Sequence, residues 1–132
     1  MNKLAIVTAL ITSLTATVGA YAGAPPLRNP VNIFTANGSS LASGTFDAAR
    51  HSSDSVQYIG CSMATDTVSS EYVSCFARNS SGATAYCYSS SPTLATIEAL
   101  AGVNRTSYIF FKLNTTTGKC TEITINDQST NL

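Results

Sequence analysis

Alternating hydrophobic and polar residues mark the middle of the chain and predict β-strands. Three runs rich in Tyr and Val span residues 55–65, 71–78 and 83–89. The polar segments 66–70 and 79–82 separate these runs, as turns separate neighbouring strands of an antiparallel sheet. The pattern therefore predicts a three-stranded antiparallel meander in this part of the chain.

The position of the two turns predicts which residues of the three strands face each other. With turns centred on Val68 and Ser81, Cys75 pairs with Cys61 on one side and with Cys87 on the other. Paired residues point to the same side of a sheet, so these three cysteines share one face. We call it the cysteine face.

The opposite side of the same predicted sheet collects large aromatic side chains. Phe76 pairs with Gly60 and with Tyr86 in this register, so its ring is expected to lie over a residue without a side chain. We name this group the aromatic face; its members are Tyr58, Tyr72, Phe76, Tyr86 and Tyr88. Packing against another segment explains such a face in an ordinary domain, whereas an uncovered face of this size is typical of a binding surface.

Weaker alternation predicts further strands on both sides of the meander. Residues 31–36 form a first strand that ends at the Asn37-Gly38 turn, and residues 42–50 form a second. Residues 106–114 and 120–126 form a closing hairpin. Its register pairs apolar and opposite-charge residues consistently, Phe111 with Ile123, Ile109 with Ile125 and Lys112 with Glu122.

A helix is predicted over residues 91–102. Ser91 can cap its start, Pro92 suits the first helical position and Gly102 suits its end. The apolar stripe consists of Leu94, Ile97, Leu100 and Ala101. We expect this stripe to cover the cysteine face. The predicted fold is therefore α+β, an antiparallel β-meander of about five or six strands with one helix packed on one face and disulfide staples.

The start of the chain has the pattern of a secretory signal peptide over residues 1–22. Lys3 precedes an apolar stretch, and the small residues Ala20 and Ala22 provide a cleavage site. The stretch is only about 15 residues long and contains threonines, whereas a membrane span needs roughly 20 apolar residues. We therefore predict no membrane span. A proline-rich extended arm, residues 23–30, precedes a single domain, residues 31–132.

Export to an oxidising compartment makes the four cysteines candidates for disulfides. Four cysteines allow three connectivities. The predicted strand positions favour Cys61 with Cys75 and Cys87 with Cys120, because the helix returns the chain close to the third strand. The spacing contains neither the short cysteine pair of a zinc knuckle nor a C-x-x-C redox motif. We predict no metal and no cofactor.

Charge argues against nucleic acid and anionic membranes as partners. The chain has 7 basic and 7 acidic residues, and the basic residues are scattered. Nucleic-acid binding requires clustered Lys and Arg that replace counterions. The abundance of Ser and Thr, with only 11% charged residues, instead suits contact with a protein or a carbohydrate.

Catalysis has few candidates in this sequence. His51 is the only histidine, so a Ser-His-Asp site requires it, with Asp47 or Asp54 as the orienting carboxylate. There is no G-x-S-x-G motif around a serine. A solvated turn histidine accounts for His51 more simply, and we predict no catalytic residue and no enzyme activity.

Segments 55–61, 72–75 and 86–88, followed by a single late Cys120, resemble small exported four-cysteine proteins of Gram-negative bacteria. The resemblance spans residues 46–125. It implies export but supplies no activity and no catalytic residues.

Together these patterns predict an exported, periplasmic or extracellular interaction module that binds a protein or a glycan through the aromatic face. Three alternatives remain open. An inhibitor of an exported or host hydrolase would use the loop 66–70, and an extracellular assembly subunit would use the arm 23–30. A small hydrolase would use His51. The oligomeric state and the choice between periplasm and medium are open as well.

Overall fold

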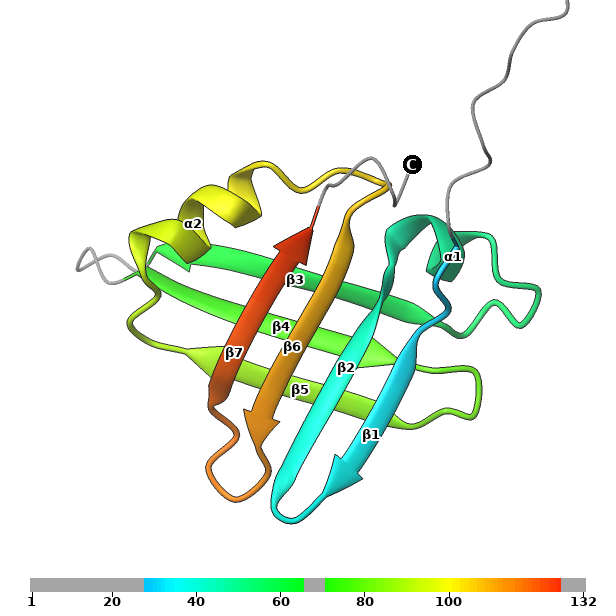
Figure 1. The fold of residues 1–132 in the computed structure, drawn as a ribbon, viewed down its shortest axis with the longest axis horizontal. Helices are drawn as coiled ribbons and strands as arrows, with labels where there is room; N and C mark the ends of the chain where they lie inside the picture. The colour runs from blue at the N-terminus through cyan, green and yellow to red at the C-terminus, as the bar shows by residue number, and fades with distance from the viewer. Residues whose placement is uncertain (1–27, 66–70, 127–132) are drawn as a thin grey trace, which may run out of the picture.

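The computed structural model describes residues 28–65 and 71–126. In these ranges the chain forms seven strands and two helices (Figure 1). In chain order they are β1 (Asn32–Ala36), β2 (Ser39–Thr45), α1 (Phe46–Arg50), β3 (Tyr58–Thr65), β4 (Glu71–Arg78), β5 (Thr84–Ser89), α2 (Leu94–Ala101), β6 (Tyr108–Asn114) and β7 (Cys120–Asn126). The predicted signal peptide, most of the arm and the loop 66–70 lie outside the described residues.

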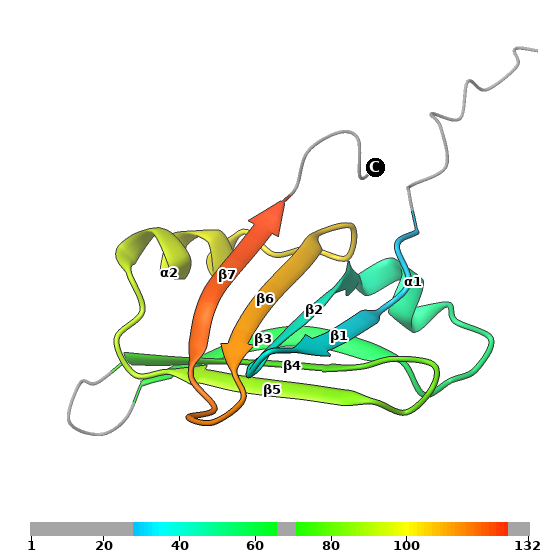
Figure 2. The same cartoon turned by 60° about the horizontal axis from the view of Figure 1, so that its bottom comes forward.

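The strands belong to two antiparallel sheets that pack face to face. One sheet has the order β1-β2-β6-β7, and the other has the order β3-β4-β5. The strands of the two sheets cross at a large angle in Figure 1, and the two layers are separate in Figure 2. The fold is thus a small β-sandwich with crossed layers.

The three-stranded sheet has the register that alternation predicts. Cys61 pairs with Cys75, Cys75 pairs with Cys87, and Phe76 pairs with both Gly60 and Tyr86. The meander of β3, β4 and β5 is therefore confirmed. Only short segments separate these strands along the chain, so side-chain period and the position of those segments suffice to define the pairing.

The rest of the predicted architecture is wrong in two respects. The seven described strands form two sheets, not one meander of five or six strands. The cysteine face is covered mainly by the four-stranded sheet, and the predicted helix reaches it only at one end, where Leu100 packs against the shared core. Residues from both sheets share one buried cluster, which includes Val73 and Cys75 from β4 and Ala42, Ile109 and Phe111 from the other sheet. A sheet buries the long, flat cysteine face more completely than one two-turn helix does.

Helix α2 instead lies at one end of the sandwich, where it contacts β7 and β3 (Figure 1). None of its residues is fully buried, and Leu94 is 70% exposed. The helix begins later than predicted because Thr93 caps it, accepting a hydrogen bond from Thr96 N at 3.2 Å. Gly102 ends it, as predicted.

The predicted strand over residues 42–50 is only half a strand. The chain is extended in β2 as far as Thr45 and then forms the short helix α1. The Thr45 hydroxyl oxygen accepts a hydrogen bond from Ala48 N at 3.3 Å and so caps the helix. Asp47 in the first turn and the helix-forming alanines after it favour the same change.

The closing hairpin of β6 and β7 has the predicted pairs, including Phe111 with Ile123. A bulge at Thr121 then shifts the register, so that Cys120 pairs with Leu113. Without the shift, Cys120 would face the same side as Lys112, away from the core. The bulge therefore turns Cys120 toward the three-stranded sheet.

The described end of the arm is attached to the sandwich. Asn29 O accepts a hydrogen bond from Thr45 N at 3.0 Å. Arg28 Nε lies 3.1 Å from the carboxylate oxygen Oδ2 of Asp47, as an ion pair without hydrogen-bond geometry. These contacts hold the chain beside β2 before β1 begins.

Gly44 permits this close approach, and Gly44→Ala is expected to lower the free energy of unfolding by about 1–3 kcal/mol. A Cβ atom at Gly44 would lie 3.1 Å from Val31 Cα and 3.3 Å from Pro30 O. Both are backbone atoms, so the strand itself must move. Urea unfolding measures the change. Ser43→Ala, one residue earlier on the other side of β2, is the control, and an equal loss there would contradict the steric explanation.

Candidate binding face

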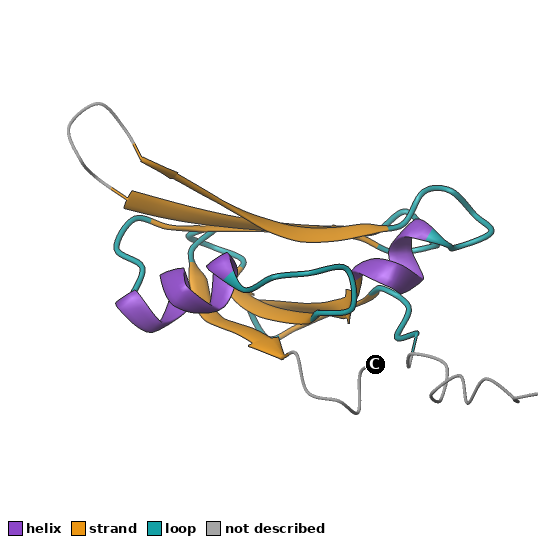
Figure 3. Ribbon diagram, turned by 90° about the horizontal axis from the view of Figure 1, so that it is seen from above, coloured by secondary structure: helices purple, strands orange, loops and turns teal. Residues whose placement is uncertain are grey.

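The five side chains of the aromatic face come from all three strands of the smaller sheet. Their relative exposures range from 37% for Phe76 to 58% for Tyr86, while Cys75 and Cys87 on the other side are fully buried. Seen edge-on, both helices and the four-stranded sheet lie on the cysteine side (Figure 3). Phe46 of α1 reaches the edge of the aromatic face, where its Cε1 would lie 3.5 Å from a Cβ at Gly60. Within residues 28–65 and 71–126, no helix or strand lies across the rest of the face.

The Phe76 ring in the middle strand β4 lies over Gly60 of the edge strand β3. A Cβ atom there would lie 3.2 Å from Cε2 and Cζ of Phe76, so the ring rests directly on the glycine backbone. The Tyr58 and Phe76 rings have centroids 6.0 Å apart and an interplanar angle of 59°. This tilted arrangement is favourable for aromatic pairs and fixes two rings of the face relative to each other. The ring position over Gly60 agrees with the prediction from the register.

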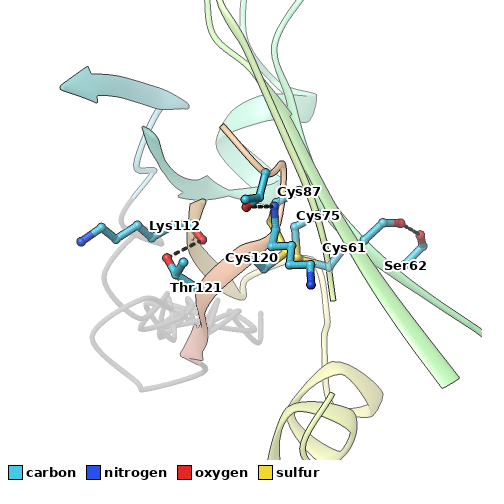
Figure 4. The surroundings of a disulfide bond; sticks show 10 residues. Cys61, Ser62, Cys75, Cys87, Lys112, Cys120 and Thr121 are labelled. Atoms are coloured by element: carbon cyan, nitrogen blue, oxygen red, sulfur yellow. Dashed lines mark hydrogen bonds between the residues drawn. A yellow bond between two sulfur atoms is a disulfide. The ribbon is translucent and has the colours of Figure 1, made fainter. Parts of the chain in front are cut away.

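Hydroxyl groups lie between the aromatic side chains. The Ser62 and Ser74 hydroxyls are 2.9 Å apart and hydrogen-bonded, and Ser74 pairs with Tyr88 on its other side. Figure 4 shows Ser62 on the opposite side of its strand from the cysteine sulfurs. Along the fully described strands β3, β4 and β5, the only charged residues are Glu71 and Arg78, at the two ends of β4. The middle of the face is therefore uncharged.

The turn between β6 and β7 borders the face at Tyr88, a contact that the sequence reasoning missed. Tyr88 N donates a hydrogen bond to Gly118 O at 3.1 Å, and Tyr88 forms a parallel bridge with Lys119. Gly118 has a positive φ of 69°, which favours glycine. The Thr-rich turn therefore lies beside the outer strand of the aromatic face.

The structure places His51 at the end of α1, on a different part of the molecule. Its Nδ1 lies 2.9 Å from Asp47 O and 3.1 Å from Asp47 Oδ1. The nearby Ser52 hydroxyl donates to Ala49 O at 2.9 Å and to Asp54 Oδ1 at 3.2 Å. The histidine and a carboxylate thus meet, but the neighbouring serine hydroxyl is engaged in the turn.

Asp54 organises that turn. Its Oδ1 accepts hydrogen bonds from the backbone N–H groups of Val56 at 3.0 Å and Gln57 at 3.2 Å. The bond from Val56 N–H, followed by those from Gln57 and Ser52, lowers the Asp54 pKa below its usual value. Its contribution to stability is present above the unfolded-state pKa and is lost as pH falls through the lower folded-state value. Gln57 Oε1 in turn accepts from Val31 N at 3.0 Å, so the carboxylate has a structural role.

His51→Ala is expected to leave ligand binding unchanged, because His51 interacts with the end of α1 and not with the aromatic face. Its side chain is 54% exposed, so we also expect a stability change within about 0.5 kcal/mol. Binding assays and thermal unfolding of the same preparation check both points. If the wild-type protein hydrolyses a substrate and the folded His51→Ala variant does not, the hydrolase alternative is established.

All four cysteines form disulfides. Cys61 bonds to Cys75 between β3 and β4, and Cys87 bonds to Cys120 between β5 and β7. This is the connectivity that the sequence favoured. The sulfur atoms of Cys75, Cys87 and Cys120 lie within 4.8 Å of one another, but each is already bonded to another sulfur and is not a free thiolate for a metal.

The described ranges contain no helix of the length and apolarity needed to cross a bilayer. In comparisons with known proteins, the chain matches no protein-family model, no curated protein and no solved structure.

Proposed function

We propose that this protein is an exported, non-enzymatic interaction module that binds a protein or a glycan through its aromatic face. One observation carries the proposal. Five aromatic side chains from three adjacent strands remain exposed on a sheet side that no described element covers beyond the edge contact of Phe46. The two disulfides indicate an oxidising compartment. The periplasm and the extracellular medium both provide one.

The composition of the face supports binding. Tyrosine combines a large apolar ring with a hydroxyl that can donate and accept hydrogen bonds, and it is enriched in interfaces and among their energetically important residues. The Ser62 and Ser74 hydroxyls add polar groups between the rings. Since the middle of the face carries no charge, we expect recognition by stacking and hydrogen bonding, with weak dependence on salt.

The shape of the face also supports the proposal. The rings project from a sheet of three strands, so they form a broad platform and not an enclosed pocket. Enclosed, mostly apolar pockets are typical of small-molecule sites. A platform suits a ligand that is itself extended, which is true of a polysaccharide chain and of a protein surface.

Tyr86→Ala is expected to weaken ligand binding by about 1–4 kcal/mol, because an exposed aromatic residue in an interface is a frequent hot spot. Tyr86 is the most exposed member of the face at 58%, so the truncation should change stability less than binding. Pull-down from envelope extract and culture supernatant identifies the ligand. Titration calorimetry with that ligand then measures the loss.

Phe34→Ala is the matched control, since Phe34 is 62% exposed but lies in β1 of the other sheet. We expect it to bind the ligand as wild type does. Equal weakening by both substitutions, or a collapse of thermal stability in Tyr86→Ala alone, would contradict the proposed role of the aromatic face. Capture of one hydrolase whose binding is insensitive to Tyr86→Ala would establish the inhibitor alternative.

A further inference from the structure

The two disulfides lie beside each other in the core between the sheets. Figure 4 shows Cys61, Cys75, Cys87 and Cys120 in one group. The Cys75 sulfur lies within 4.8 Å of both sulfurs of the Cys87–Cys120 bond. Cys75 and Cys87 are also directly paired across β4 and β5. Opposed positions in antiparallel strands have Cα separations of about 4.5–5.5 Å, within the range that a disulfide spans.

The four cysteines differ in exposure. Cys75 and Cys87 are fully buried, whereas their respective partners Cys61 and Cys120 are half-buried. An external thiolate therefore has access first to an outer sulfur, at Cys61 or at Cys120. Attack at either outer sulfur releases an inner one as the leaving thiolate, and that thiolate faces the other disulfide.

We propose that the cysteines form a thiol–disulfide exchange relay that connects Cys61 with Cys120 through a Cys75–Cys87 bond. The co-reactant is a low-molecular-weight thiol in its thiolate form. It attacks Cys61 Sγ, forms a mixed disulfide and displaces the Cys75 thiolate. The Cys75 thiolate then attacks Cys87 Sγ, forms the Cys75–Cys87 disulfide and displaces the Cys120 thiolate, which takes up a proton from water. Two disulfides and one thiolate react, and two disulfides and one thiolate result. The added thiol is oxidised into the mixed disulfide as Cys120 is reduced, so no other oxidant or reductant is needed.

The relay has a direction that burial explains. A thiolate in apolar surroundings is costly, so negative charge at the fully buried residue Cys75 is less favourable than charge at the half-buried residue Cys120. The product has one disulfide within the small sheet, which joins β4 to β5 in place of the native bond between β3 and β4. It loses the bond between β5 and β7, which joins the two sheets. This property concerns the core and does not depend on the aromatic face.

The chain allows a direct readout of the exchange. Trypsin cleaves after Arg50, Arg78, Arg105 and Lys119, which separates Cys87 and Cys120 but leaves Cys61 and Cys75 in one peptide. The native protein gives peptide 79–105 linked to the peptide that begins at Cys120. The exchanged protein gives peptide 51–78 linked to peptide 79–105, whether the thiol entered at Cys61 or at Cys120.

Wild-type protein is incubated with one equivalent of 2-mercaptoethanol at pH 8, and the reaction is stopped with acid. Free thiols are then alkylated with N-ethylmaleimide at mildly acidic pH, and the protein is digested with trypsin at the same pH. Among molecules that carry one mercaptoethanol adduct, we expect most to contain peptide 51–78 linked to peptide 79–105. We also expect formation to slow close to tenfold for each pH unit below the thiol pKa, since the thiolate is the nucleophile. The proposal would be overturned if molecules that carry the adduct have an alkylated Cys75 or Cys87 and retain the other native disulfide. In such molecules the released inner thiolate has not attacked that disulfide.

The Cys61→Ala variant provides an independent test that needs no added thiol. Its unpaired Cys75 is expected to displace Cys120, so that N-ethylmaleimide labels Cys120 in most molecules at pH 8. The Cys61→Ala/Cys75→Ala double variant is the control, because it lacks the attacking thiol and should leave Cys120 unlabelled. Labelling of Cys75 but not Cys120 in the folded single variant would overturn the relay. Circular dichroism establishes that both variants are folded.

Discussion

Phe111→Ala is expected to lower the free energy of unfolding by about 3–5 kcal/mol. Phe111 in β6 is fully buried and belongs to the cluster that both sheets share. It pairs with Ala42 in β2 and Ile123 in β7, and neither neighbour has the volume to fill the space left by a ring. A loss of this size removes a large share of the stability of a small domain, which is about 5–15 kcal/mol. Urea unfolding followed by circular dichroism measures it.

Phe110→Ala is the matched control for this prediction. Phe110 is adjacent in β6, points to the opposite side of the sheet and is only half-buried. The same truncation should therefore cost clearly less. Equal losses for Phe110 and Phe111 would contradict the assignment of the core to the space between the two sheets.

Removal of the Cys87–Cys120 disulfide in a Cys87→Ala/Cys120→Ala variant is expected to cost about 2–5 kcal/mol. The bond joins β5 to β7, which belong to different sheets, across a sequence separation of 33. Without it the unfolded chain gains conformational entropy, and the two layers depend on apolar packing for their contact at this end. Alanine is used because a serine hydroxyl at the buried Cys87 position would add a desolvation cost of its own.

A Cys61→Ala/Cys75→Ala variant is the comparison for the second prediction. That disulfide closes a sequence separation of only 14, between strands that the β3–β4 ladder already joins. Loop-closure entropy grows with loop length, so we expect the smaller loss here. Thermal unfolding of the two variants side by side gives the order. A larger loss for the Cys61 and Cys75 pair would contradict the structural role of the bond between the sheets.

The side-chain pattern of β3, β4 and β5 was sufficient to predict their pairing, their two faces and the position of Phe76 over Gly60. These strands are close together in the sequence, and a one-residue slip in such a meander would expose every apolar side chain of the cysteine face. The hairpin of β6 and β7 was predictable for the same reason as far as Lys112 and Glu122. The sequence was therefore sufficient to identify the candidate binding residues. Their exposure was visible only in the structure.

Three features depended on contacts that local patterns do not encode. Thr45 caps α1 locally, but its backbone N–H and hydroxyl also bond to Asn29 O, 16 residues earlier, and so hold the end of β2 beside the arm. The bulge at Thr121 turns Cys120 inward, where Cys87 lies. The helix supplies only part of the cover of the cysteine face and the four-stranded sheet supplies most of it, because alternation shows that a face is buried but not which element buries it.

What the sequence alone determined is the set of short-range choices: which residues alternate, where the chain turns and which side of β3, β4 and β5 each residue occupies. Their physical basis is the two-residue period of a strand and the short closure of its turns. Only the tertiary structure decided that β1, β2, β6 and β7 form a second sheet, that this sheet covers the cysteines and that α2 lies at one end. These choices depend on the total apolar area buried between segments far apart in the chain, which no local pattern contains.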